Sequence, residues 1–191
     1  MKSMSESRKK MLVGGFIAFI MVASIFVVTL DYLFSPAQGL TYNGIKFTPS
    51  NNQFFAKVNG KEYSFLVYPE DLEYLDFPPK VKELVKAEVI TVTYDPQSEA
   101  AQGLATAQYY IEEQLKDVKF IDRAVLNNTG LALEQKSCVN GTAYQPVIEL
   151  SQGENSSINV EGDCIKLTAF DTPDLLRMTE AVIYRALGVM Q

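Results

Sequence analysis

The residue whose type and position best suit chemistry is Asp95. It follows a run rich in β-branched residues (88–94) and precedes a helical pattern at residues 97–116. In open α/β sheets, ligands bind at the carboxyl ends of strands and near helix N-termini, so Asp95 and Ser98 form a candidate ligand edge. Asp followed by Pro is also a typical helix start, with the carboxylate as cap and the proline at the first helical position. We favour this structural interpretation of Asp95.

The other carboxylate pairs do not predict a catalytic site. Glu112 and Glu113 are adjacent on a helical pattern, so their side chains diverge by about 100° and cannot share a site. Asp171 and Asp174 are explained by the positive end of a helix. The sequence has no histidine, which excludes a Ser-His-Asp triad and removes the commonest metal ligand. We therefore predict no catalytic residue, cofactor or metal site, and incline against an enzyme.

The chain has two cysteines, Cys138 and Cys164, and they are not arranged as C-x-x-C. Outside the cytosol thiols tend to pair, so we predict a structural disulfide, with two buried free cysteines as the alternative. Three N-x-[ST] sequons make Asn127, Asn140 and Asn155 candidate glycan acceptors in an outer domain.

These groups must be positioned relative to a membrane, because residues 11–34 are strongly apolar. Residues 11–30 are twenty positions without a charge, and a helix of that length covers about 30 Å, the thickness of a bilayer core. The tail at residues 1–10 has a net charge of +3, whereas the chain beyond Phe34 has 13 basic and 21 acidic residues. A short basic flank marks the cytoplasmic end of a spanning helix. We predict a single-pass protein of the cell membrane, with a cytoplasmic tail, a signal-anchor at residues 11–34 and an extracytoplasmic remainder.

Two other interpretations of the apolar segment remain. A cleaved signal peptide could end near residues 35–37, although its apolar core would normally be shorter. A pilin-like N-terminal helix would carry an acidic residue early in the apolar run, and here none follows until Asp31. We favour the uncleaved anchor, which contacts the lipid bilayer directly.

The residue pattern after the apolar segment predicts a linker at residues 35–40, followed by one α/β domain at residues 41–191. Alternating residues around Asn59-Gly60 predict a β-hairpin of residues 53–58 and 62–68. A strand, a helix and a strand follow across residues 88–126, a pattern typical of two parallel strands joined by a crossover. Further predicted elements are a strand at 131–139 that carries Cys138, a hairpin of 144–150 with 158–169, and a helix at 173–187. The fold class is thus α/β, a mixed sheet with β-hairpins and packed helices, preceded by one transmembrane helix.

Function is predicted only in outline. The acidic exterior argues against nucleic acid, which requires clustered Lys and Arg. Aromatic residues cluster at Tyr63, Phe65, Tyr68, Tyr74 and Phe77, and we interpret them as core and not as an interface. Our leading hypothesis is a non-enzymatic interaction or assembly module of the cell envelope that binds another membrane or envelope protein. The alternative is a ligand-binding or hydrolytic domain that uses the Asp95 edge.

Overall fold

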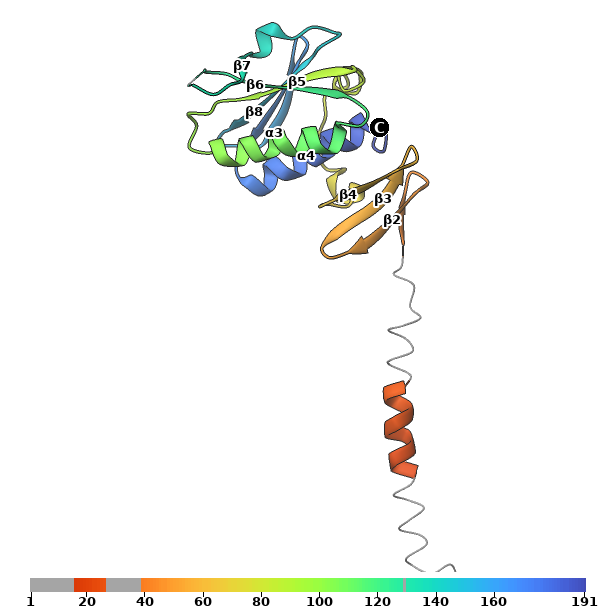
Figure 1. The fold of residues 1–191 in the computed structure, drawn as a ribbon. Helices are drawn as coiled ribbons and strands as arrows, with labels where there is room; N and C mark the ends of the chain where they lie inside the picture. The colour runs from red at the N-terminus through yellow and green to blue at the C-terminus, as the bar shows by residue number, and fades with distance from the viewer. Residues whose placement is uncertain (1–15, 27–38, 129) are drawn as a thin grey trace, which may run out of the picture. The chain divides into compact units, whose positions relative to one another are not determined.

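The computed structural model describes residues 16–26, 39–128 and 130–191, and these residues form two β-sheets and four α-helices (Figure 1). The mixed α/β class predicted from the sequence is therefore confirmed. The chain divides into two compact units, Met1–Gly39 and Leu40–Gln191, which we describe separately.

The first unit contains a helix at residues 16–26, inside the predicted membrane segment. Its apolar side chains are exposed, among them Phe16, Phe19 and Phe26. Within the part of the chain that the structure describes, no helix has both the length and the apolar character needed to cross a membrane. The remainder of the predicted segment, its basic tail and most of the linker lie outside the described residues.

The second unit begins with a small antiparallel sheet in the order β1-β2-β3-β4. Its strands are β1 (Leu40–Tyr42), β2 (Ile45–Ser50), β3 (Gln53–Val58) and β4 (Lys61–Phe65). The hairpin predicted around Asn59-Gly60 is confirmed, and both turn residues have positive φ, 50° and 86°. Two-residue turns of this kind suit the twist of paired strands, and Asn and Gly tolerate the conformation best.

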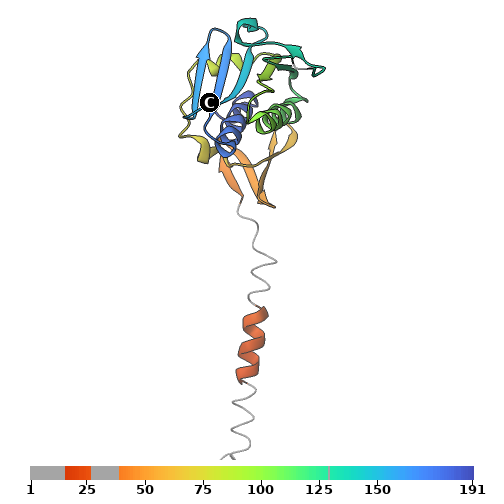
Figure 2. The ribbon, with the colours of Figure 1, turned by 90° about the vertical axis from the view of Figure 1, so that its left-hand side faces the viewer.

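A larger sheet follows in the order β7-β6-β5-β8-β10-β9. Its strands are β5 (Val89–Tyr94), β6 (Phe120–Val125), β7 (Glu134–Gln135), β8 (Val147–Gln152), β9 (Ser157–Glu161) and β10 (Cys164–Ala169). Helix α3 (Ala101–Leu115) joins β5 to β6, and these strands are parallel, as predicted. Helices α3 and α4 (Thr172–Ala186) lie side by side on one face of the sheet (Figures 1 and 2).

The structure corrects two of the predicted elements. The segments at 144–150 and 158–169 do not form one hairpin, because β10 lies between β8 and β9, parallel to the first and antiparallel to the second. Half of the residues of β8 are buried and only the last is exposed, so its backbone needs a neighbour on each side, and β5 and β10 occupy those positions. The predicted strand at 131–139 is reduced to the two residues of β7, since this segment has no buried face. Cys138 instead begins the short 3-10 helix η2 (Cys138–Asn140).

The small sheet is held to the helices by an aromatic core. Phe47 and Phe65 are fully buried, and their rings lie 6.2 and 4.3 Å from the ring of Tyr184 in α4. Tyr63 and Tyr68 are also buried. The interpretation of the aromatic cluster as core is therefore correct for these residues and for the partly buried Phe77, but wrong for Tyr74, which is 66% exposed because it follows η1 on the surface. Two short helices, η1 (Pro69–Leu72) and α2 (Val81–Leu84), connect the two sheets.

Candidate functional site

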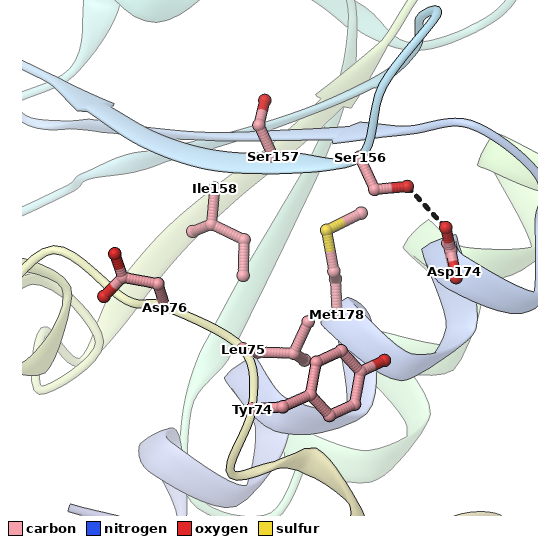
Figure 3. A pocket seen from close by; sticks show the side chains of 8 residues that line it. All are labelled: Tyr74, Leu75, Asp76, Ser156, Ser157, Ile158, Asp174 and Met178. Atoms are coloured by element: carbon pink, nitrogen blue, oxygen red, sulfur yellow. Dashed lines mark hydrogen bonds between the residues drawn. The ribbon is translucent and has the colours of Figure 1, made fainter.

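A cavity lies where three elements meet: the segment after η1, the start of β9 and the first half of α4. Its volume is about 380 Å³ (Figure 3). We call it the Tyr74–Asp174 pocket, and its lining consists of Tyr74, Leu75, Asp76, Ser156, Ser157, Ile158, Asp174 and Met178.

The N-terminus of α4 forms one wall of this pocket. Asp171 is the N-cap, and its carboxylate accepts a hydrogen bond from the backbone N–H of Asp174 at 2.8 Å. The hydroxyl of Ser156 donates to Asp174 at 2.5 Å and accepts from the backbone N–H of Phe170 at 3.0 Å. Arg177 pairs with the other oxygen of Asp174 at 2.9 Å. These contacts fix the loop before β9 against the helix. The polar side chains of this wall therefore already have hydrogen-bond or ion-pair partners.

The opposite wall carries an acidic group without such partners. Figure 3 shows Asp76 and Asp174 at opposite sides of the pocket, with the side chains of Leu75, Ile158 and Met178 between them. Among the described residues Asp76 forms no ion pair, whereas Asp174 is paired with Arg177. Tyr74 is 66% exposed at the rim. An apolar floor beside one unpaired carboxylate suits a cation carried on an apolar stem, such as a Lys or Arg side chain.

The pocket does not have the geometry of a hydrolytic site. The base that accepts from the hydroxyl of Ser156 is the carboxylate of Asp174, which is already paired with Arg177. Both hydrogen-bonding roles of this hydroxyl are used to hold the loop in place. A nucleophilic serine requires a base that can take its proton and a third group that orients the base.

The predicted ligand edge lies elsewhere, at the end of β5. Asp95 and Ser98 share one turn, in which the carboxylate of Asp95 accepts from the backbone N–H of Gln97 at 2.9 Å. Asn127 donates to the same carboxylate oxygen at 3.3 Å. The prediction that Asp95 caps the following helix is wrong, because α3 begins at Ala101. Asp side chains stabilise turns by this local hydrogen bond. Here the turn occupies the start of the predicted helix, so the helix begins later in the chain than predicted.

The predicted disulfide is confirmed, since Cys138 and Cys164 are bonded with their Cα atoms 5.1 Å apart. The sequon residues Asn127, Asn140 and Asn155 are all exposed. Their accessibility is compatible with glycosylation, which remains a prediction.

Sequence reasoning missed a buried carboxylate, that of Glu180 in α4, which is fully inaccessible to solvent. One of its oxygens accepts from the backbone N–H of Leu66 at 2.7 Å and from the hydroxyl of Tyr110 at 3.0 Å. Its other oxygen is buried and has no hydrogen-bond partner among the residues that the structure describes. Burial raises the pKa of Glu180 to about 7. The sequence did contain a signal for this residue. Glu180 is a charged residue four positions after Leu176, on the apolar face of the predicted helix.

A second polar cluster lies on the face of the large sheet away from α3 and α4. Asp122 in β6 accepts from Lys136 at 2.6 Å, from Gln145 at 3.0 Å and from Thr91 at 3.1 Å. Lys136 and Gln145 belong to the connection between β6 and β8. Every member of this cluster has a partner, so we interpret it as the structural attachment of that connection to the sheet.

Comparison with protein-family models, with curated protein sequences and with solved structures finds no match. Any functional interpretation therefore depends on the geometry and charge of the chain itself. The Tyr74–Asp174 pocket is the strongest candidate, because it combines a concave shape, an apolar floor and an unpaired charge.

Proposed function

We propose that this protein is a single-pass, membrane-anchored module of the cell envelope whose Tyr74–Asp174 pocket receives a Lys or Arg side chain of another envelope protein. The observation that carries the proposal is Asp76, an unpaired carboxylate across an apolar floor from Asp174. The alkyl stem of the incoming residue packs on Leu75, Ile158 and Met178, and its charge pairs with Asp76.

The membrane anchor is supported by the sequence pattern and by local structure. Residues 11–30 are uncharged and follow a basic tail, and the central residues 16–26 are helical with exposed apolar side chains. A single spanning helix satisfies all its own backbone groups in lipid. The net charge of −8 beyond Phe34 also favours a basic partner, because an acidic surface attracts basic proteins and speeds their encounter.

The pocket is tested with the purified full-length chain in detergent and two small probes, Nα-acetyl-lysine amide and Nα-acetyl-arginine amide. Binding is followed by NMR shifts of the methyl groups of Met178 and Ile158. We expect saturable binding of both probes, and loss of most of the affinity in Asp76→Asn. Nα-acetyl-glutamine amide, which lacks the charge, should not bind.

A matched control uses Asp71, an exposed acid on η1 that does not line the pocket. Asp71→Asn should bind the charged probes like the unmodified chain. Equal binding of the charged and uncharged probes, or equal losses in the two variants, would contradict the proposed site. The partner itself can then be sought with a photoreactive residue at Tyr74, compared with one at the exposed Tyr109 of α3.

The hydrolytic or ligand-binding alternative at Asp95 and Ser98 receives less support. Their side-chain oxygens accept hydrogen bonds from the backbone of their own turn. We retain this alternative as a prediction that mutation of Asp95 can test.

A further inference from the structure

Charge is separated between the two ends of the second unit. The small sheet, residues 40–65, contains three lysines and one glutamate, a net charge of +2. Residues 66–191 contain 10 basic and 20 acidic residues, a net charge of −10. Of these two parts, the net-positive one is the part nearer the predicted anchor in the chain.

Two of the three lysines of the small sheet, Lys46 and Lys57, lie on its outer face. Lys46 and Lys57 are exposed and form no ion pair among the described residues, whereas Lys61 pairs with Asp117 at 3.5 Å. The outer face is hollowed by about 510 Å³, and both of these lysines line the hollow together with the half-buried ring of Phe55. One acidic residue, Glu62, also lines it, opposite Lys57 on the neighbouring strand. The inner face carries Phe47, which is fully buried against the core.

We infer that the outer face of the small sheet binds the anionic headgroups of the bilayer in which the chain is anchored. The inference rests on the proposed membrane anchor. Lys46 and Lys57 supply the charge, and Phe55 supplies an aromatic surface at the level of the headgroups. The acidic remainder of the unit is repelled by the same lipids, so both signs of charge favour the same orientation.

The length of chain between anchor and sheet brings the two surfaces within reach. Five residues, 35–39, separate the apolar segment from Leu40, and an extended chain covers about 3.3–3.6 Å per residue. The sheet therefore begins no more than about 20 Å from the membrane surface. Two lysines bind lipid weakly in free solution, but tethering raises the effective concentration and makes a weak contact sufficient.

The experiment uses the full-length chain in liposomes of neutral phosphatidylcholine, with or without anionic phosphatidylglycerol. A membrane-impermeant amine reagent labels exposed lysines, and mass spectrometry gives a rate for each. We expect Lys46 and Lys57 to react at least threefold more slowly in the anionic liposomes. Lys82 and Lys86, on or next to α2, are exposed and form no ion pair within the described part of the chain, and they should react equally in both. The difference should disappear in about 0.5 M NaCl, where the Debye length falls to a few ångströms.

A second readout needs no charge change. The chain has no tryptophan, so Phe55→Trp introduces a single indole, and brominated lipids should quench its fluorescence. Tyr109→Trp on α3 is the control and should not be quenched. Equal labelling of all four lysines in both lipids, or equal quenching of both variants, overturns the inference. Flotation of the same liposomes separates the causes: a chain that floats yet shows neither effect is anchored without headgroup binding, whereas a chain that does not float overturns the anchor as well.

Discussion

The backbone N–H of Leu66 donates a hydrogen bond to the carboxylate of Glu180 at 2.7 Å, although the two residues are 114 positions apart. Leu66 follows the last strand of the small sheet, and Glu180 lies in the middle of α4. The hydroxyl of Tyr110 in α3 donates to the same oxygen at 3.0 Å. One buried carboxylate thus joins the small sheet to both long helices.

The pKa of about 7 for Glu180 predicts a pH-dependent stability. Because this value lies above the unfolded value of 4.5, the folded state binds more protons, and the free energy of unfolding falls as the pH rises from about 4.5 to about 7. Glu180→Gln keeps an acceptor for Leu66 and Tyr110 and removes the titration. At pH 8 this variant should be more stable than the unmodified chain by an amount on the order of 2–3 kcal/mol. Thermal unfolding of the full chain in detergent measures the difference.

The advantage of Glu180→Gln should shrink as the pH falls towards 4.5 and disappear below that pH, where the carboxyl group of the unmodified chain is protonated in both states. Glu180→Ala serves as the control, since it leaves the donors of Leu66 and Tyr110 unpaired and should destabilise the protein at every pH. Parallel stability curves for the Gln variant and the unmodified chain would show that Glu180 does not titrate in this range.

The disulfide should stabilise the fold by about 3–4 kcal/mol, because it closes a loop of this length in the unfolded chain. It joins η2 to β10 across 26 positions and helps hold the connection between β6 and β8 on the sheet. We expect Cys138→Ser, Cys164→Ser and the double variant to lose similar amounts, since each removes the same bond. Chemical unfolding with and without reductant checks this, and additive losses in the double variant would indicate separate roles.

Gln108 in α3 is buried and bridges two neighbouring strands. Its side-chain amide donates to the carbonyl oxygens of Val92 and Ala124 at 2.7 and 2.9 Å. Gln108→Met removes the hydrogen-bond donor of both carbonyl oxygens, and we expect the free energy of unfolding to fall by about 1–3 kcal/mol. Gln102→Met, at an exposed position of the same helix, should change it by less than about 0.5 kcal/mol. Equal effects would mean that the bridge contributes nothing specific.

The proposed topology predicts the outcome of protease protection. Protease added to intact cells should digest the chain from Ser35 onward and leave a small membrane-bound fragment that contains residues 11–34. Cytoplasmic marker proteins must stay intact in the same sample. A domain that becomes accessible only after the membrane is dissolved would contradict the orientation.

Mutation of Asp95 separates the proposed function from its alternative. Asp95→Asn keeps an oxygen that accepts from Gln97, so the change in stability should be less than about 0.5 kcal/mol. Binding of the lysine and arginine probes should also be unchanged, because Asp95 does not line the Tyr74–Asp174 pocket. A variant that folds normally but reproduces the full loss-of-function phenotype would favour the ligand edge at β5.

The sequence by itself determined the local elements. Asn59-Gly60 predicted its hairpin because few residues other than Asn and Gly adopt positive φ easily. The run at 88–94 and the helical pattern after it predicted the parallel pair of β5 and β6, since such crossovers follow general rules of chain connection. The presence of two cysteines in a predicted outer domain was enough to predict their pairing.

Only the tertiary structure decided which distant segments meet. β10 lies between β8 and β9, so the order of the strands depends on which of them has two neighbours. The residue pattern of one strand does not show how many neighbouring strands it has. Asp76 and Asp174 are 98 positions apart and line the same pocket only because the segment after η1 lies near α4. Glu180 interrupts an apolar helix face, but its partners are supplied by Leu66 and Tyr110 from other elements. Local preferences are set by neighbours along the chain, whereas sites arise from packing between elements far apart in it.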